Sequence, residues 1–314
     1  MPRKHPFPLI LFLFLAGGVC APARAEIGTI TTIAGGGPKN VLATKAHLHN
    51  PTDVATDSQG NVYIVTSGQA EVFRVDAVTG VLTAAAGSDS SGFNGDGGPA
   101  KQASLNGPYG LAVDAAGNLF IADSYNDRIR RVDAVTHRIT TFAGGGTGCA
   151  GHTYIGDSCA ATAAILYLPS GVAVDGAGNV LIADLGHNRI RRVDAVTGVI
   201  TTVAGGKTGN LGTLGDGGLA TDANLSFPQG VSLDGAGNVL IADTNHNRIR
   251  RVDATTHIIT TVAGANRPVR ALADAMGNLF ITHRGLLQPH PANRRDKRDD
   301  HNRRRHRRLW LYRR

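Results

Sequence analysis

The sequence predicts an all-β protein assembled from repeated four-stranded antiparallel units. The first observation is a block at residues 172–184 that recurs almost letter for letter at 111–123 and 231–243, and in worn form at 54–66 and 271–282. The second is the spacing of the Asn that follows Gly in each copy, with intervals of 57, 61, 59 and 40 residues. The third is that no helical period separates the copies.

Each unit is expected to hold four strands, which the third copy illustrates. Residues 171–174 and 180–183 form the first two, and the Asp-Gly-Ala-Gly-Asn segment between them is a hairpin sequence with glycines for positive φ. The second strand contains no polar residue, which predicts burial on both faces. Residues 189–194 form the third strand, and a turn at 195–198 leads to the fourth at 199–204, a β-branched run typical of a half-exposed edge.

Antiparallel four-stranded units in series are typical of a β-propeller. A solenoid of parallel strands is the weaker alternative, because its coils are shorter. The string Gly171-Val-Ala-Val-Asp-x-x-Gly-Asn-Val-Leu-Ile-Ala-Asp-x-x-His-Asn-Arg-Ile190 resembles the NHL repeat, and Gly-Asp-Gly-Gly-Pro-Ala loops between units resemble its longer-period exported bacterial form. The resemblance covers roughly residues 29–282. It implies a propeller, usually of six blades.

The count of units predicts an incomplete ring. Four complete blades span residues 52–264, two strands of a fifth follow, and residues 29–34 read as an unattached fourth strand that would complete the last blade. We therefore expect a truncated six-bladed ring, incomplete or strained, because repeat arrays depend on neighbouring interfaces. The short last interval predicts that an inter-blade loop has been lost between Gly264 and Pro268.

The N-terminus reads as a secretory signal peptide over residues 1–25. Arg3 and Lys4 precede an apolar run at residues 9–16, and Ala-Arg-Ala at 23–25 is a small-x-small cleavage site. The run is too short to span a bilayer. We expect a secreted or periplasmic protein with no membrane span after cleavage, and a monomer. In an exported protein, Cys149 and Cys159 in one inter-blade loop predict a disulfide, with two free thiols as the alternative.

The net charge of +8 would suggest a nucleic-acid partner if it were spread over the whole chain, but it is not. Residues 284–314 carry a net charge of +9 and the signal segment adds three basic residues, so residues 26–283 carry −4. The propeller, residues 26–282, is thus mildly acidic, and no nucleic-acid partner is expected.

The tail, residues 283–314, is expected to be disordered. Read one nucleotide forward, its codons permit Ala-Thr-Ile-Thr-Thr-Val-Ala-Gly, the missing fourth strand, which indicates a frameshift. The alternative is an evolved basic arm that attracts polyanions. Re-sequencing the locus distinguishes the two.

The most regular polar pattern is Asp-x-x-(Asn/His)-x-Arg. An Asp at the end of the second strand and an Arg at the start of the third are predicted to pair across the connecting loop, as a structural fastener rather than a catalytic site. The predicted pairs are Asp123 with Arg128, Asp184 with Arg189, and Asp243 with Arg248. The first blade departs from the pattern, with Thr66 and Glu71, so its loop is expected to be held differently.

His187 and His246 raise a metal hypothesis, because a propeller gathers equivalent residues around its axis. The second blade has Asn126 at that position and no carboxylate cluster accompanies the histidines, so hydrogen bonding is the preferred interpretation. No metal ligand, cofactor or catalytic residue is assigned. The glycine-rich inter-blade loops lack the Gly-Lys-Ser/Thr of a phosphate loop and the carboxylate spacing of an EF-hand. Because loops carry recognition, the candidate binding residues are Asn94, Asp96, Asp157 and Asp216.

These features together predict an exported propeller scaffold that binds an unknown protein or carbohydrate ligand and has no catalytic site. The alternative is a metal-dependent propeller hydrolase or lyase, since some propellers of this type are lactonases or lyases with a metal in the central channel. The functional residues of those enzymes do not map onto this sequence. A unique, non-repeating cluster of His, Asp and Glu would favour the enzyme. A channel lined by repeat-equivalent residues would favour the scaffold.

Overall fold

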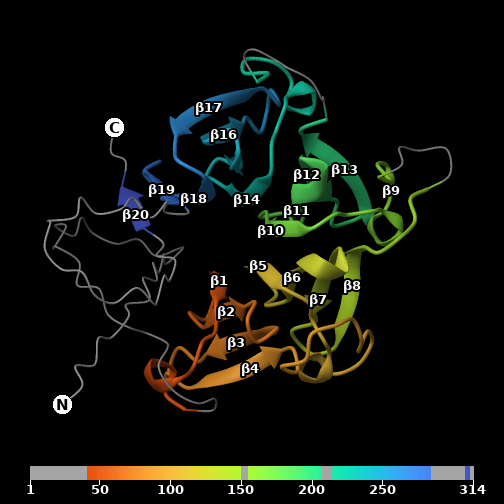
Figure 1. The fold of residues 1–314 in the computed structure, drawn as a ribbon, viewed down its shortest axis with the longest axis vertical. Coiled ribbons are helices and arrows are strands. Elements are labelled where there is room, and N and C mark those ends of the chain that lie inside the picture. Colours follow the sequence, from red (N-terminus) through yellow and green to blue (C-terminus); the bar gives the residue numbers. More distant parts are fainter. Residues whose placement is uncertain (1–40, 150–154, 207–213, 284–307, 312–314) are drawn as a thin grey trace, which may run out of the picture. The chain divides into compact units, whose positions relative to one another are not determined.

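The computed structural model describes residues 41–149, 155–206, 214–283 and 308–311. Figure 1 shows the strands of the described chain as a ribbon. The chain divides into two compact units, and the boundary passes through the third sheet. Unit 1 comprises Met1–Ile182 and Arg192–Thr201, and unit 2 comprises Ala183–Arg191 and Thr202–Arg314.

The described chain folds into four complete sheets and a partial one, which we call blades 1 to 5. Blade 1 consists of β1 (Pro51–Thr56), β2 (Val62–Thr66), β3 (Glu71–Val75) and β4 (Leu82–Ala86), and blade 2 of β5 (Pro108–Val113), β6 (Leu119–Asp123), β7 (Arg128–Val132) and β8 (Ile139–Gly144). Blade 3 consists of β10 (Pro169–Val174), β11 (Val180–Asp184), β12 (Arg189–Val193), β13 (Val199–Ala204) and the short β9 (Cys159–Ala160) at its edge. Blade 4 consists of β14 (Pro228–Leu233), β15 (Val239–Asp243), β16 (Arg248–Val252) and β17 (Ile259–Gly264), and blade 5 of β18 (Pro268–Ala273), β19 (Leu279–His283) and β20 (Arg308–Leu311).

The only helical elements in the described residues are 3₁₀ turns of three residues each. They are η1 (Ala43–Lys45), η2 (Ala100–Gln102), η3 (Ser124–Asn126), η4 (Ala161–Ala163), η5 (Leu185–His187) and η6 (Ala220–Asp222). No helix in the described ranges is long and apolar enough to cross a membrane. The predicted all-β class and the four strands of each complete unit are therefore confirmed, and the expected signal peptide and the strand at residues 29–34 lie outside the described residues.

The tail differs from the expectation at one place. Residues 308–311 form β20, which pairs antiparallel with β19 through Phe280 opposite Leu311 and His283 opposite Arg308. The prediction of disorder is therefore wrong for these four residues, since β19 offers an open edge with which they pair. The rest of the tail lies outside the described residues, and the frameshift hypothesis stays a prediction.

One asparagine per blade ties the two hairpins of that blade together. In blade 3, Asn179 Nδ2 donates to Asp175 Oδ2 (2.7 Å), while Asn179 Oδ1 accepts the backbone N–H of Ala195 (2.9 Å) in the turn between the third and fourth strands. Blades 1, 2 and 4 repeat both bonds. The Asn that marks the repeat in the sequence therefore spans from the first hairpin to the second.

Core clusters join neighbouring blades, and a further cluster that includes Ile64 and Phe73 lies within blade 1 and the segment before it. Every residue of β2, β6, β11 and β15 is buried, as predicted for a second strand covered on both faces. In unit 1, one cluster joins Val65 and Val72 of blade 1 to Leu111 and Ile121 of blade 2. Because each side chain is buried against the next sheet, the stability of a blade depends on its neighbours.

The first strands of adjacent blades approach closely at a glycine. A Cβ on Gly110 of β5 would clash with the carbonyl oxygen of Ser170 in β10 and lie 3.0 Å from the Cα of Gly171. Both neighbours are backbone atoms, so neither can rotate away.

We expect Gly110→Ala to lower the free energy of unfolding by about 1–3 kcal/mol, because the added methyl overpacks this contact. Urea unfolding of the purified chain measures the effect. Gly176→Ala is the control, since a Cβ there meets nothing within 4 Å. Equal unfolding midpoints for the two variants would contradict the close packing of these strands.

The inter-blade loops cover the outer edge of the blade that they precede. The loop before blade 2 donates from Gly97 N to Ile139 O (2.7 Å) and from Ala100 N to His137 O (2.9 Å). In unit 2, Gly217 N donates to Ile259 O (2.9 Å) in the same way. In blade 3 this segment is regular enough to form β9, which pairs with β13. Only residues 265–267 separate β17 from β18, which agrees with the predicted loss of this loop before blade 5.

Candidate functional site

The aspartate that ends the second strand is the centre of a buried polar cluster. Asp123 is fully buried. One carboxylate oxygen accepts the backbone N–H of Asn106 (2.6 Å), and the other accepts Asn126 Nδ2 (2.8 Å) and Arg130 Nη1 (3.2 Å). Donors from two loops and one strand therefore converge on a single carboxylate.

The guanidinium of Arg130 joins this carboxylate to the preceding inter-blade loop. Arg130 is also fully buried, and its Nη2 lies 2.6 Å from Asp96 Oδ1 and 3.3 Å from the carbonyl oxygen of Asn94. The second oxygen of Asp96 accepts the hydroxyl of Thr141 (2.6 Å). We call the set Asp96, Asp123 and Arg130 an arginine clamp. It fixes the loop, the second strand and the third strand to one another.

Blade 4 carries the same clamp. Arg250 lies 3.3 Å from Asp243 and 2.7 Å from Asp216, and Asp216 accepts the hydroxyl of Thr261 (2.7 Å). In blade 3, Arg191 lies 3.4 Å from Asp184. The repeated arrangement indicates a structural fastener, as the recurrence of the pattern predicted.

The predicted arginine partners were wrong by two residues. Arg128 and Arg248 stand opposite Asp123 and Asp243 in the strand register, yet the ion pair is formed by the arginine two residues further along the third strand. That residue lies on the same face and reaches the carboxylate diagonally. Instead, the Arg128 guanidinium carbon lies 4.1 Å from the ring centre of Phe93, and Arg189 is directed at the carbonyls of Gly205 and Gly206 (3.5 Å).

The residues proposed for recognition are largely engaged inside the blades. Asp96 and Asp216 use both carboxylate oxygens in the clamps, and Asn94 Oδ1 accepts the backbone N–H of Ser104 (2.8 Å). The loops that carry them fold back onto the outer strands, and the part of these residues in recognition stays a prediction. Asp157 stands 34 residues before Arg191, the same interval as in the two clamps.

This interval is the signal that sequence reasoning missed. The loops before blades 2, 3 and 4 each carry an Asp 34 residues before a third-strand Arg, in the pairs Asp96 and Arg130, Asp157 and Arg191, and Asp216 and Arg250. In blade 1, Phe73 stands at the arginine position, and Thr66 replaces the Asp that ends the second strand of the other complete blades. The Thr66 hydroxyl donates to the carbonyl of Glu71 (3.1 Å). The joint absence of both residues in blade 1 confirms that its loop is held differently.

The histidines of the pattern act as hydrogen-bonding residues. His187 Nδ1 and His246 Nδ1 each lie 2.9 Å from the buried Asp of the same blade, and Asn126 Nδ2 makes the equivalent bond in blade 2 (2.8 Å). Within the described ranges, no group of three or more His, Cys, Asp or Glu is arranged to hold a metal ion.

A left-handed residue after each of these turns binds the next blade. Asp127 (φ 54°) accepts the backbone N–H of Leu168 through Oδ1 (2.7 Å), and Asn247 (φ 57°) accepts that of Arg267 (2.8 Å). The hydroxyl of Ser124 donates to the carbonyl of Pro169 (2.6 Å). The loop between second and third strands therefore supports both its own clamp and the start of the following blade.

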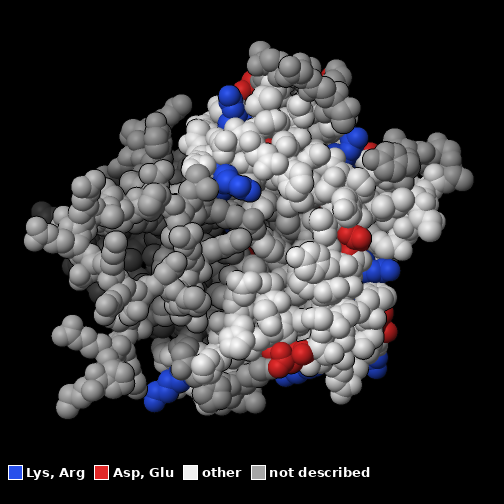
Figure 2. Space-filling view, viewed as in Figure 1, with Lys and Arg blue, Asp and Glu red and all other residues white. Residues whose placement is uncertain are grey.

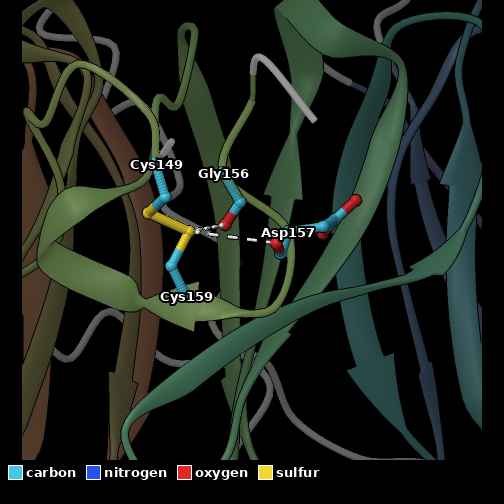
Figure 3. The surroundings of a disulfide bond; sticks show 4 residues. All are labelled: Cys149, Gly156, Asp157 and Cys159. Atoms are coloured by element: carbon cyan, nitrogen blue, oxygen red, sulfur yellow. Dashed lines mark hydrogen bonds between the residues drawn. A yellow bond between two sulfur atoms is a disulfide. The ribbon is translucent and has the colours of Figure 1, made fainter. Parts of the chain in front are cut away.

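The predicted disulfide between Cys149 and Cys159 is confirmed (Figure 3). The Cys159 sulfur lies 3.1 Å from the Gly156 carbonyl oxygen and 3.8 Å from that of Asp157. A disulfide sulfur has no proton to donate, so these are close contacts. Because Cys159 belongs to β9, the bond ties the loop of blade 3 to its edge-covering strand.

The NHL repeat family model matches residues 166–193 and 225–252, which are the core of blades 3 and 4. NHL repeat-containing protein 2 of Gallus gallus is 36% identical over 101 residues, covering 32% of this chain and 13% of that protein. This chain is a β-propeller in which two blades match the NHL repeat. Protein SUPPRESSOR OF QUENCHING 1, chloroplastic, of Arabidopsis thaliana is 29% identical over 236 residues, 71% of this chain and 22% of that protein. The chain thus spans less than a quarter of the length of either relative.

Among solved structures, a chain of a nidogen/laminin complex has a TM-score of 0.53, with 18% identity over 74% of this chain and 72% of that chain. At this identity the likeness concerns the propeller fold alone.

The charged side chains of the propeller are dispersed on the face drawn in Figure 2. Lys and Arg there form small separate groups, with Asp and Glu between them and uncharged residues over most of the described surface. On that face, the described residues form no continuous basic surface for a polyanion.

Each complete blade also carries a partly exposed aspartate at the turn between its third and fourth strands. Asp76 Oδ1 accepts the N–H groups of Thr79 (2.9 Å) and Val78 (3.1 Å) and the Thr79 hydroxyl (3.0 Å). These bonds, led by that from the Thr79 backbone, lower the pKa of Asp76 to about 2. The equivalent backbone bonds lower the pKa of Asp133, Asp194 and Asp253.

We expect the free energy of unfolding to fall as the pH drops from 4 towards 2. The pKa values of these aspartates are lower in the folded chain than in the unfolded chain, so the unfolded chain binds more protons in this range. Their stabilisation is complete above the unfolded pKa and is lost as the pH passes through the folded values. Urea unfolding at pH 7, 4 and 2.5 measures this, and replacing all four aspartates by Asn should flatten the acid slope. An equally steep slope in that variant would contradict the assignment.

Proposed function

We propose that this chain is a non-catalytic binding module, an exported propeller scaffold that takes a protein or carbohydrate ligand at its loops. The observation that carries the proposal is the arginine clamp. The polar residues that recur in the blades are directed at buried guanidinium groups of the same blade, with Asp123 and Asp243 fully buried. A recurring polar set used in this way supports a scaffold rather than a repeated reaction centre.

The disulfide supports the proposed secreted or periplasmic location. Disulfides form and persist in oxidising compartments, and the Cys149–Cys159 bond closes a loop at the edge of blade 3. The N-terminal signal sequence is the second support, from the sequence alone. The proposal would fail if cell fractionation recovered the folded chain from the cytoplasm with both thiols reduced.

Metal analysis combined with two histidine variants tests the binding-module proposal against a metal-dependent enzyme. The variants are His187→Asn and His246→Asn, which install the residue that blade 2 carries at the same position. We expect less than stoichiometric zinc, calcium or manganese in the purified full chain, and no change in metal content or ligand binding on substitution. One metal ion per chain that is lost in these variants would overturn the proposal.

A further inference from the structure

The strongest departure from the repeat is a group of exposed aromatic residues in blade 2 and in the loops on either side of it in the sequence. The exposed fractions of Phe93, Tyr125 and Tyr167 are 45%, 68% and 50%. At the position of Tyr125, blades 3 and 4 carry Gly186 and Asn245. Because the residues that surround Tyr125 are nearly identical among the blades, its ring is not explained by the scaffold that the blades share.

Tyr125 belongs to the segment 124–128, which links β6 to β7, and hydrogen bonds join this segment to the backbone next to Phe93 and Tyr167. Asn126 Nδ2 donates to the carbonyl of Gly92 (2.7 Å), beside Phe93. Asp127 Oδ1 accepts the backbone N–H of Leu168 (2.7 Å), beside Tyr167. Two inter-blade loops are therefore held against one five-residue segment, and each presents an exposed ring there.

The Tyr125 ring is covered on one side by Gly107. A Cβ added to Gly107 would be 2.5 Å from Cδ2 of the ring. In blades 3 and 4, the positions of Gly107 are filled by Leu168 and Phe227 instead, and the position of Tyr125 is small or polar. The glycine thus makes room for the tyrosine, while most of the ring surface stays accessible to solvent.

The group also contains a cation without a carboxylate partner. The Arg128 guanidinium carbon lies 4.1 Å from the ring centre of Phe93. Arg130 and Arg131 pair with aspartates, but no carboxylate in the described part of the chain forms an ion pair with Arg128. The neighbouring Asp127 uses one carboxylate oxygen on the backbone of Leu168. Arg128 therefore has no opposing carboxylate among the described residues, while Asp127 keeps its own negative charge next to it in the chain.

We propose that this aromatic group, Phe93, Tyr125, Arg128 and Tyr167, binds an acidic polysaccharide. The exposed ring of Tyr125, covered on one side by Gly107, suits the apolar face of a pyranose ring, and Arg128 supplies the guanidinium that pairs with a uronate carboxylate. The inference rests on the proposed binding function and names its ligand class and its location.

Affinity electrophoresis of the full chain through gels containing polygalacturonate tests the proposal, with dextran as the neutral comparison. The variants are Tyr125→Asn and Arg128→Gln, and the first installs the residue of blade 4. Arg248→Gln is the matched control, because Arg248 holds the repeat position of Arg128 in blade 4. Thermal unfolding of each variant confirms that it is folded.

We expect retention by polygalacturonate but not by dextran, about tenfold weaker affinity for Tyr125→Asn and for Arg128→Gln, and unchanged affinity for Arg248→Gln. Equal retention of all variants, or retention by dextran of equal strength, would overturn the proposal. Competition by polyglutamate as effective as that by free polygalacturonate would also overturn it, because the ligand would then be any polyanion. None of these results would contradict the proposed binding function itself, which is tested by the metal analysis and the histidine variants described above.

Discussion

Arg130→Met is expected to lower the free energy of unfolding by about 3–5 kcal/mol, the cost of removing one partner from a buried ion pair. Without the guanidinium, the fully buried Asp123 keeps the bonds from Asn106 and Asn126 but loses its only cationic partner. Asp96 is released as well, so the preceding loop should loosen. Urea unfolding measures the first effect, and amide hydrogen exchange of the Gly97 N–H measures the second.

Arg131→Met is the control for this prediction. Arg131 pairs with Asp133 at 3.3 Å at the surface, and such pairs contribute about 0–1 kcal/mol. Similar losses for Arg130→Met and Arg131→Met would show that the clamp contributes no more than a surface pair.

A double variant should recover most of the loss. Blade 1 folds with Thr66 and Phe73 at the positions of Asp123 and Arg130, so Asp123→Thr combined with Arg130→Phe installs a pair that this scaffold already accepts. Replacing both members of a buried ion pair by well-packed residues is often neutral. The Nε of Arg130 has no hydrogen-bond partner in the described structure, which further limits what the native pair contributes. A double variant less stable than Arg130→Met would contradict the expectation that the Thr and Phe of blade 1 can replace the buried ion pair.

Replacing both Cys149 and Cys159 by Ser is expected to cost about 3 kcal/mol, the chain-entropy value for closing a loop of this size. The loss should centre on blade 3, where Ser158 N donates to Ile200 O (2.8 Å) and β9 pairs with β13. Unfolding with and without dithiothreitol measures it. The wild-type chain should be destabilised by the reductant and the double variant should not. A variant as stable as the oxidised wild type would contradict a stabilising role.

The strands and their order could be predicted from the sequence because the repeat supplied several readings of one pattern. Residues 199–204 were predicted as a strand and are β13, and the buried second strands followed from runs without polar residues. These are local properties, set by residue periodicity and turn chemistry.

The clamp could not be predicted with the same certainty. The pairing of Asp123 was assigned to Arg128, which is directly opposite, but Arg130 is the arginine that reaches the carboxylate in the interior. Which arginine is buried depends on the adjacent loop, and the loop contact lies 34 residues away. A recurring sequence separation was visible, but its meaning required the fold. Likewise, the sequence assigned no role to Tyr125, whose ring lies against Gly107 and is exposed.

The position of the inter-blade loops has a consequence for how such chains evolve. Each loop covers the outer edge of the blade that follows it, and in blades 2 and 4 it also supplies the clamp aspartate, Asp96 or Asp216, to that same blade. The unit that can be duplicated or deleted without breaking a fastener is therefore a loop together with the four strands after it. A recombination point just after the fourth strand keeps that unit whole, whereas one inside the loop separates a carboxylate from its arginine. Only residues 265–267 separate blade 5 from blade 4, so blade 5 corresponds to a unit that has lost the loop before its strands.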